Sequence, residues 1–358
     1  GSTSGRALVT TAHGGAEVLH LERRPIPHPG AGQVRVRVHA AALNHLDLWV
    51  RNGLPGMVLP LPLVPCADGA GVIDAIGAGV DAGRTAPWLA VGAAVVIYPV
   101  VGCGQCRVCK VGDEPLCAAF GMLGEHRDGC AQDYIVVDAS RVLPMPSNLA
   151  FADAASLPTT LVTAWHMLHV AGRMQPGETV VVHGAASGVG AAALQLARAA
   201  GARVIATVRR DRDVSFATDL GADAVLRNDD PNWPRAAKAL CPGGVDVVIE
   251  HVGGAVFEAS LKALRRGGRL VTCGATAGHR VDLDLRKIFF HSIAIVGSTM
   301  GSRSDLMQAL RLVELGRVRP AVGAVFALED GAEAMTALEE RRVQGKVVLD
   351  LCSARDQG

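Results

Sequence analysis

Hydrophobic and polar residues alternate with a period of two in "QVRVRVHAAAL", residues 33–43. This pattern predicts a strand with one buried face. Two further apolar segments, "GAGVIDAIGAGV" and "GAAVVIYPVV", also predict strands, and glycine and proline punctuate this part of the chain heavily. We therefore expect residues 1–150 to form a mainly β domain, built as a small barrel with long loops.

The pattern changes near residue 150, where "ADAASLPTTLVTAWHML" predicts helix with a local break at Pro158. From residue 179 onward, apolar strands such as "TVVVHGA", "ARVIATV" and "GRLVTCG" alternate with amphipathic helices such as "GVGAAALQLARAAG". This alternation predicts a parallel sheet that helices cover on both faces. We expect an α/β domain over residues 151–300, and a C-terminal segment, 301–358, that returns to the first domain through the strand "VQGKVVLDL".

Charge and composition exclude several classes of function. The 358 residues carry a formal net charge of +1, and acids and bases are interspersed. This charge distribution does not indicate a surface that binds nucleic acid or a membrane. No apolar run reaches the roughly eighteen residues of a membrane span, and "GSTSGRALVTTAHGG" lacks the apolar core of a signal peptide. We expect a cytoplasmic protein that acts on a small molecule.

Four of the nine cysteines lie in "GCGQCRVCKVGDEPLC", residues 102–117, with the spacing C-x2-C-x2-C-x7-C. The cluster predicts a metal site, zinc first, at Cys103, Cys106, Cys109 and Cys117. A redox-active thiol cluster is the alternative. Four thiolates would fill a tetrahedral zinc site and leave no position for water or substrate.

A dinucleotide-binding turn is predicted by "VVVHGAASGVG", residues 180–190, which follows a strand and opens a helix. Such a turn lets backbone N–H groups approach a pyrophosphate at a helix N-terminus. The usual G-x-G-x-x-G pattern appears as A-A-S-G-V-G, so Ala185 and Ser187 stand where glycines are usual. A tight turn without function is the alternative. The candidate cofactor contacts are Gly184, Ser187, Gly188, Val189 and Gly190.

The cofactor type depends on the tip of the second strand, "IATVRRD". An NAD site usually places an acid there for the ribose 2′-hydroxyl, but this tip carries Arg209 and Arg210. Arginines hold a 2′-phosphate well, which favours NADP(H). Asp211 follows directly, so NAD(H) stays open, as does the interpretation that both arginines are solvated.

Taken together, these motifs resemble the medium-chain dehydrogenase/reductase superfamily. The resemblance covers nearly the whole chain and includes "AALNHLDLWVRNG", the cysteine loop, "GAASGVGAAALQLA", "LRRGGRLVTCGA" and "GKVVLDL". It implies a GroES-like β domain followed by a Rossmann domain with a doubly wound parallel sheet. It also implies one structural zinc in the 102–117 lobe, and homodimers or homotetramers that join near "SIAIVG".

Zinc alcohol dehydrogenases of this superfamily hold a second, catalytic zinc, and here its ligand positions are changed. The resemblance places Asn44, Ala67 and Thr159 at the three protein ligands, and Leu46 at the proton relay. Alanine cannot bind a metal, and asparagine and threonine are poor zinc ligands. A rebuilt site is the alternative, from the nearby metal-competent residues His45, Cys66, Asp68 and Cys130.

The resemblance also indicates candidate residues for catalysis and for contact with the cofactor. Asn44 would face the nicotinamide and substrate, His45 would contact phosphate or act as an acid, and Thr163 would lie beside the nicotinamide. His126, in the loop "LGEHRDG", would donate a proton or simply fix the loop by an ion pair, and Asp68 would have a structural role near the site. The remaining candidates are cofactor contacts: Gly274, Ala275, Ser298, Thr299, Met300 and Lys346, the last of which could instead be solvated.

These features favour an NADP(H)-dependent reductase of an activated C=C bond, in an enone, enal or quinone-like substrate, that works without a catalytic zinc. Without a Lewis acid, oxidation of a plain alcohol is difficult, whereas hydrogen-bond donors are enough to stabilise an enolate oxygen. A zinc-type alcohol dehydrogenase or carbonyl reductase with an atypical site is the first alternative. A non-catalytic dinucleotide-binding sensor is the second.

Overall fold

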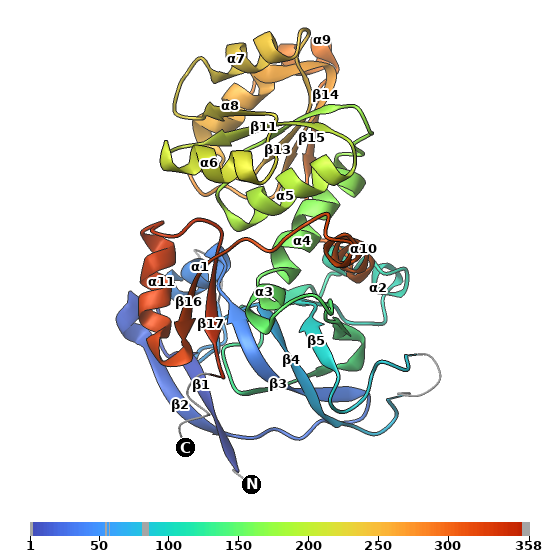
Figure 1. The fold of residues 1–358 in the computed structure, drawn as a ribbon, viewed down its shortest axis with the longest axis vertical. Coiled ribbons are helices and arrows are strands. Elements are labelled where there is room, and N and C mark those ends of the chain that lie inside the picture. Colours follow the sequence, from blue (N-terminus) through green and yellow to red (C-terminus); the bar gives the residue numbers. More distant parts are fainter. Residues whose placement is uncertain (1–2, 54–55, 57, 81–85, 353–358) are drawn as a thin grey trace. The chain divides into compact units, whose positions relative to one another are not determined.

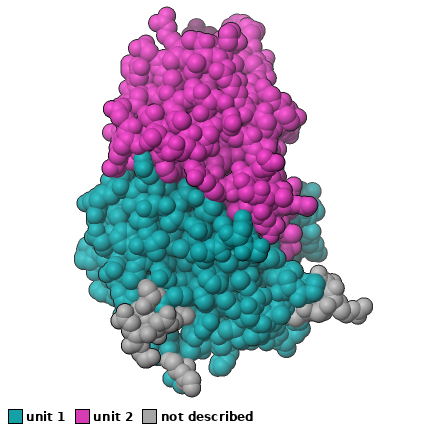
Figure 2. Space-filling model, in the orientation of Figure 1, with its two compact units in different colours: residues 1–159, 320–358 teal, residues 160–319 magenta. Residues whose placement is uncertain are grey.

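The alternating segment forms β3 (Gln33–Ala42), whose Val34, Val36 and Val38 are fully buried. The computed structural model describes residues 3–53, 56, 58–80 and 86–352. They fall into two compact units, residues 1–159 with 320–358, and residues 160–319, which Figure 2 colours separately. The sequence places domain boundaries at 150 and 300, whereas the two units divide after residues 159 and 319.

The first unit contains an open sheet with the strand order β16-β17-β3-β4-β5-β9, and β8 pairs with β3 (Figure 1). Its elements are β1 (Ser4–Thr10), β2 (Leu19–Pro25), β3, α1 (His45–Asn52), β4 (Asp68–Ile76), β5 (Ala94–Ile97), β6 (Val100–Val101), α2 (Arg107–Lys110), β7 (Gly121–Met122), β8 (Tyr134–Asp138), β9 (Val142–Pro144), α3 (Phe151–Ala155), β16 (Val322–Ala327), α11 (Gly331–Glu339) and β17 (Lys346–Asp350). The C-terminal strand β17 pairs antiparallel with β3, so the end of the chain belongs to this sheet.

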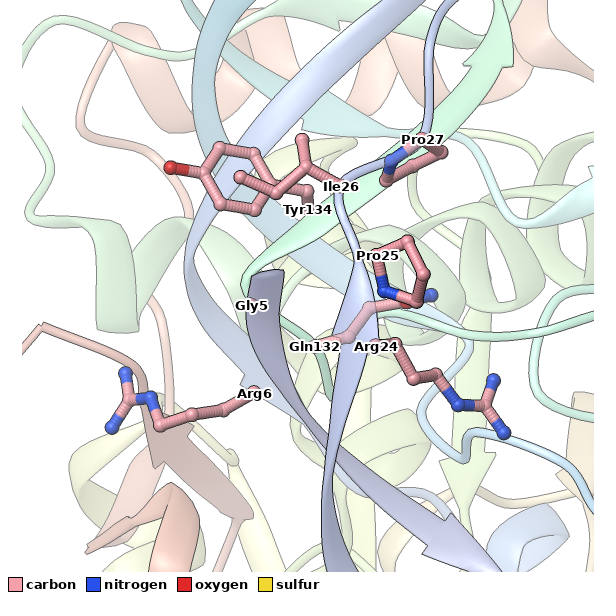
Figure 3. A pocket seen from close by; sticks show the side chains of 8 residues that line it. All are labelled: Gly5, Arg6, Arg24, Pro25, Ile26, Pro27, Gln132 and Tyr134. Atoms are coloured by element: carbon pink, nitrogen blue, oxygen red, sulfur yellow. The ribbon is translucent and has the colours of Figure 1, made fainter. Parts of the chain in front are cut away.

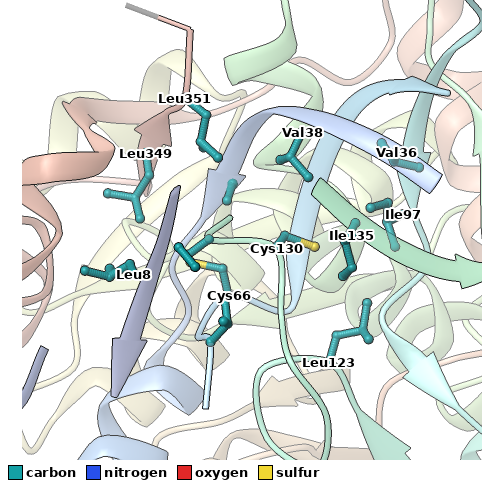
Figure 4. Close-up of a cluster of buried hydrophobic side chains, with 14 of the residues drawn as sticks. Leu8, Val36, Val38, Cys66, Ile97, Leu123, Cys130, Ile135, Leu349 and Leu351 are labelled. Carbon is teal, nitrogen blue, oxygen red and sulfur yellow. The ribbon is translucent and has the colours of Figure 1, made fainter. Parts of the chain in front are cut away.

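The core of the first unit is built from the inward faces of these strands. Val36 and Val38 of β3 pack with Ile97 of β5 and Ile135 of β8 (Figure 4). Two cysteines lie in the same cluster, Cys66 and Cys130, and both are fully buried. This core holds β3 and its neighbours in fixed register, which positions the strand ends described below.

The second unit is a parallel six-stranded sheet in the order β12-β11-β10-β13-β14-β15. Its elements are α4 (Pro158–Trp165), π-helix η4 (His166–Ala171), β10 (Thr179–Val182), α5 (Gly188–Ala199), β11 (Arg203–Val208), α6 (Arg212–Asp219), β12 (Ala224–Arg227), α7 (Trp233–Leu240), β13 (Val245–Glu250), α8 (Gly254–Ala263), β14 (Leu264–Thr272), α9 (Leu285–His291), β15 (Ala294–Gly297) and α10 (Arg303–Glu314). Counted from β10, this is the order 3-2-1-4-5-6 of a dinucleotide-binding sheet, with its switch point between β10 and β13. The predicted fold class, a GroES-like domain with a doubly wound Rossmann sheet, is confirmed.

The predicted helix over 152–168 is interrupted where the sequence indicates. α3 ends at Ala155, and Pro158 begins α4, where its missing N–H is tolerated. Short 3-10 segments cover the remaining helical turns: η1 (Ala16–Val18), η2 (Glu114–Leu116), η3 (Ala139–Arg141) and η5 (Leu328–Asp330). Within the described residues, no helix is long and apolar enough to cross a membrane.

A small pocket opens beside β1 and β2 (Figure 3). It is lined by Gly5, Arg6, Arg24, Pro25, Ile26, Pro27, Gln132 and Tyr134. Its volume is about 10 Å³, which is about what one water molecule requires. It contains none of the predicted site residues, so we do not assign a substrate to it.

Candidate active site and metal centre

The four cysteines of the 102–117 lobe point at one another. All four Sγ atoms lie within 4.8 Å of each other. Cys103 Sγ is 4.0 Å from Cys109 Sγ, and Cys106 Sγ is 3.8 Å from Cys117 Sγ. A tetrahedral zinc with Zn–S bonds of about 2.3 Å requires Sγ atoms about 3.8 Å apart. The donor set and its spacing therefore fit zinc.

Backbone N–H groups lower the pKa of two of these thiols, whereas burial raises the pKa of the Cys109 thiol to about 12. The N–H groups of Gln105 and Cys106 donate to the Cys103 thiol and lower its pKa to about 6. Those of Cys103 and Ala119 donate to Cys117 and lower its pKa as well. Because thiolates are the ligands of zinc, these bonds favour the metal-binding form. With four protein ligands the site is closed, which fits a structural zinc and not a catalytic one.

A second polar cluster forms where the end of β3 meets the starts of two neighbouring strands. β4 and β17 both run antiparallel to β3, so Asp68 and Lys346, their first residues, lie beside its end. Asn44 follows β3 and precedes α1, and Thr159 lies in the first turn of α4. We call Asn44, Asp68, Thr159 and Lys346 the Asn44 cluster. Its members are far apart in the sequence and are brought together by strand pairing.

The Asp68 carboxylate is fully buried and accepts four hydrogen bonds. The backbone N–H and the hydroxyl of Thr159 donate to Oδ1, at 2.8 and 2.6 Å. Asn44 Nδ2 donates to Oδ2 at 2.9 Å, and Lys346 Nζ donates to the same oxygen at 3.2 Å. Lys346 is only 5% exposed, so its ammonium is a buried charge paired with a buried carboxylate.

This arrangement does not fit a catalytic zinc. Both oxygens of Asp68 are occupied by donors, and the cation beside them belongs to Lys346. Burial raises the pKa of the Cys66 and Cys130 thiols, which keeps them neutral. Among the described residues, the only group of three or more His, Cys, Asp or Glu side chains that could share a metal is the four-cysteine lobe. The alternative of a rebuilt zinc site therefore receives no support from the geometry.

The segment before Asp68 is held by the start of α1. Asp47 is buried, and it accepts hydrogen bonds from the backbone N–H groups of Asn44 and Cys66, both at 2.7 Å. Burial raises the pKa of Asp47 to about 6 in spite of these two donors. Cys66 has φ = 73°, a left-handed conformation that is uncommon for a residue with a side chain. Asp47 thus fixes both Asn44 and the turn that leads to Asp68.

Two predicted histidines lie outside the Asn44 cluster. His45 is the first residue of α1, directly after Asn44. His126 is exposed; its Nδ1 lies 3.3 Å from Glu125 Oε2 and accepts from the Met122 N–H. The His126 loop packs against the turn at Cys66, because the Cys130 N–H donates to the Cys66 carbonyl at 2.7 Å. The Met122 N–H···Nδ1 bond holds the His126 ring in this loop, and both interpretations of His126, proton donor or loop-fixing residue, stay open.

The predicted cofactor turn in the second unit has the geometry that a pyrophosphate needs. Ser187 caps α5 and accepts from the Gly190 N–H at 3.1 Å. The backbone N–H groups of Gly188 and Val189 donate to no other group in the described part of the chain. Gly184 has φ = 58°, and a Cβ at Gly190 would stand 2.1 Å from the Gly184 carbonyl oxygen. These residues fit a dinucleotide at the N-terminus of α5.

The two arginines after β11 differ in their partners. Arg210 is committed to Asp213, with bonds of 2.9 and 3.2 Å to the two carboxylate oxygens. Arg209 is exposed and makes no hydrogen bond or contact ion pair with the described residues. Asp211 is bound to Arg227, which lies beside the end of β11. Of the predicted pair, Arg209 is the one available to a ligand.

Two predicted nicotinamide contacts meet in the second unit. The Thr163 hydroxyl donates to Met300 Sδ at 3.6 Å, and Met300 has φ = 53°. Ser298, which follows β15, has a buried hydroxyl without a hydrogen-bond partner in the described residues. An orphan hydroxyl of this kind suits a missing ligand. Thr299, Gly274 and Ala275 lie in the neighbouring segments that follow β15 and β14.

Sequence reasoning missed the contact between Lys346 and Asn44. It assigned Lys346 to the cofactor or to solvent, whereas Lys346 is buried and its Nζ lies 2.6 Å from Asn44 Oδ1. It also treated Thr159 only as a residue that replaces a zinc ligand. One signal was present: Lys346 and Asp68 both adjoin strongly apolar segments, and buried charges in proteins are normally paired.

Comparisons with known proteins agree with this fold. The family "Alcohol dehydrogenase GroES-like domain" matches residues 30–147, and "Zinc-binding dehydrogenase" matches residues 188–314. The NAD-dependent alcohol dehydrogenase of Sulfolobus acidocaldarius is 31% identical, over 94% of this chain and 97% of its own length.

Two solved structures extend the comparison. A crystal structure of an NAD-dependent alcohol dehydrogenase has 45% identity and a TM-score of 0.92, and the match covers 97% of this chain and 99% of the other. A crotonyl-CoA carboxylase/reductase has 26% identity and a TM-score of 0.90, with coverage of 98% and 88%. These relatives are enzymes, and they carry names for both alcohol and C=C chemistry. The Rossmann sheet, the zinc-competent lobe and the extent of these matches agree, and the chain belongs to the medium-chain dehydrogenase/reductase superfamily as one of its oxidoreductases.

Proposed function

We propose that the enzyme is an NADP(H)-dependent reductase of an activated C=C bond in an enone, enal or quinone-like substrate, and that it works without a catalytic zinc. The observation that carries this proposal is the Asn44 cluster. At two of the positions that the resemblance gives to zinc ligands it has an amide, Asn44, and a hydroxyl, Thr159, and a buried ion pair lies beside them.

Gly184, Ser187 and Gly190 would hold the dinucleotide, whose nicotinamide would supply a hydride for the β-carbon of the substrate. Negative charge then develops on the substrate carbonyl oxygen, and the Asn44 amide is the donor that would stabilise it. The α-carbon is protonated by solvent. Neither step needs an alkoxide stabilised by a metal, which is what alcohol oxidation would require.

NADP(H) is favoured by Arg209, whose guanidinium is free at the tip of β11. A charge-assisted bond to a 2′-phosphate contributes about 1.5–3 kcal/mol, or roughly a 10- to 150-fold preference in kcat/KM. We expect Arg209→Asp to reverse the preference toward NADH. Arg212→Ala, an exposed arginine on α6, is the matched control and should leave the preference unchanged.

A zinc-type alcohol dehydrogenase is the second candidate, because the 45% identical structure is named an NAD-dependent alcohol dehydrogenase. Initial rates decide between the two. The proposal expects NADPH oxidation with 2-cyclohexen-1-one or 1,4-naphthoquinone to exceed alcohol oxidation by NAD⁺ or NADP⁺ at least tenfold. Alcohol oxidation that a chelator abolishes would overturn it.

A homodimer or homotetramer is part of the proposal. β15 is an edge strand of the second sheet, and exposed apolar side chains surround it: Leu283, Leu285, Phe289, Phe290 and Ile295. Such a patch beside an unpaired edge is typical of an interface. We expect Phe290→Asp to lower the mass measured by sedimentation, whereas Leu315→Asp, at an exposed leucine after α10, should not.

A further inference from the structure

The side-chain amide of Asn44 is held between two groups of opposite hydrogen-bonding character. Lys346 Nζ lies 2.6 Å from Oδ1, and Nδ2 lies 2.9 Å from Asp68 Oδ2. An ammonium can only donate, and a carboxylate can only accept. A flipped amide would face Lys346 with its NH₂ group and Asp68 with its oxygen, and both contacts would become repulsive. The two partners therefore fix the orientation of the amide.

This orientation leaves one donor. The Nδ2 atom carries two hydrogens, and one is directed to Asp68 Oδ2. The second has no acceptor among the residues that the structure describes. Asn44 is half-buried, as is Thr159, whereas Asp68 is fully buried and Lys346 is 5% exposed, so Asn44 is more accessible than the ion pair that holds it. Lys346 occupies one of the two lone pairs of the Asn44 Oδ1.

Resting on the proposed function, we infer that Lys346 and Asp68 are positioning residues that lock the Asn44 amide, so that its second N–H donates to a carbonyl oxygen of the substrate. The site then presents an oriented N–H donor at this point. It favours a ligand group that accepts, such as the oxygen of an enone, enal or quinone.

The lock matters because the substrate oxygen becomes more basic as hydride is added. A donor that is already oriented needs no reorganisation at that moment, and loss of one such donor typically lowers kcat about 10²- to 10³-fold. The four bonds to Asp68 have a related effect. They keep its carboxylate from turning toward the ligand, where it would compete with the substrate oxygen for the same N–H.

The test observes the amide directly. The chain has five asparagines, so selective ¹⁵N-asparagine labelling gives five side-chain amide pairs, and Asn44→Ala identifies the pair of interest. We expect two well-separated proton signals for Asn44 in the whole enzyme with NADP⁺. Cyclohexanone, an acceptor-only probe that cannot receive hydride at a C=C bond, should move the signal of the proton that does not face Asp68.

The decisive variant is Asp68→Asn combined with Lys346→Met, which removes both charges together and leaves no unpaired ion. It should move the Asn44 signals of the free enzyme, weaken cyclohexanone binding at least fivefold, and lower kcat for an enone more than it raises KM. In an Asn44→Ala background the same double change should have little further effect on kcat, because the locked group is gone. Lys262→Met, at an exposed lysine of α8, is the control and should change none of these quantities.

Unchanged Asn44 signals and unchanged cyclohexanone binding in the double variant would overturn the inference. So would a cyclohexanone titration that moves neither Asn44 proton in an enzyme that reduces enones. If the proposed function is wrong, the result is different: the enzyme oxidises alcohols and does not reduce enones. The response of the free enzyme's amide signals to the double variant would still decide whether the lock exists.

Discussion

The four-cysteine lobe and the Asn44 cluster lie in the same unit, and the sequence resemblance assigns both to positions of zinc ligands. The lobe consists of four thiols whose Sγ atoms lie within 4.8 Å of each other. The Asn44 cluster has one carboxylate, and the ammonium of Lys346 is already beside it. The lobe needs an external cation to balance its thiolates, whereas the cluster supplies its own.

This difference teaches what separates a metal site from a polar cluster that needs no metal. The charge of the buried Asp68 would be costly without a partner, and Lys346, on the strand at the other side of β3, provides one. The buried cluster is polar, and its two charges are paired.

The largest effect is expected in the lobe. Cys109→Ser removes one of four thiolates, and structural zinc sites contribute about 10–16 kcal/mol of apparent binding free energy. We expect zinc to fall from one per chain to near zero, and the 102–117 segment to become sensitive to protease. Cys352→Ser, in the same unit but outside the lobe, is the control for cysteine loss. A Cys109→Ser enzyme that keeps its zinc would contradict the assignment.

The next effect is expected in the Asn44 cluster. Asp68→Asn leaves the Lys346 ammonium buried without its counter-ion, and loss of one partner of a buried pair typically costs about 3–5 kcal/mol. Urea unfolding should show this loss in the free energy of unfolding. Adding Lys346→Met should recover part of it. If the double variant is no more stable than Asp68→Asn alone, the charges are not coupled as described.

A third buried polar cluster, in the second unit, has neither metal nor charge. His183 is fully buried between Thr207 Oγ1 at 2.7 Å and Ser260 Oγ at 2.8 Å, and burial lowers its pKa from 6.5 to about 3. The unfolded chain therefore binds more protons between these values. The stability that the neutral histidine provides is complete above pH 6.5 and is lost as the pH falls toward 3.

From these pKa values, lowering the pH from 7.5 to 5 should cost about 2 kcal/mol through His183 alone. His183→Gln keeps a neutral polar side chain and should remove that part of the acid sensitivity in thermal or urea unfolding. His20→Gln, at an exposed histidine, should retain the full slope of the unmodified enzyme. Equal slopes in both variants would show that His183 is not the group involved.

The smallest effect is expected at an exposed ion pair of the same unit as the two sites. Arg342 Nη1 lies 2.9 Å from Glu333 Oε1, and both side chains are about half exposed. Such pairs contribute about 0–1 kcal/mol, because solvent screens them. Glu333→Gln should change the free energy of unfolding by less than 1 kcal/mol. If it lowers that free energy as much as Asp68→Asn does, buried and exposed ion pairs do not differ as described.

The sequence predicts one of the two sites much better than the other. The lobe is local, because its four ligands lie within one loop and their spacing alone indicates zinc. The Rossmann sheet is predictable for a similar reason. Its apolar strands alternate with helices at short intervals, and the turn at Gly184 lies within one short segment. The contact between Lys346 and Asp68 joins residues separated by 278 positions and depends on the register of β17 and β4 against β3. No local pattern specifies that register, which is why Lys346 was assigned to the cofactor.

The most direct test of the central claim is the zinc content of the intact enzyme, measured by native mass spectrometry for the unmodified chain and for Asp68→Asn/Lys346→Met. We expect one zinc per chain in both, lost only when a cysteine of the lobe is replaced. Two zinc ions per chain in the unmodified enzyme, with one of them absent from the double variant together with its activity, would show that the Asn44 cluster binds a catalytic metal and would contradict the account.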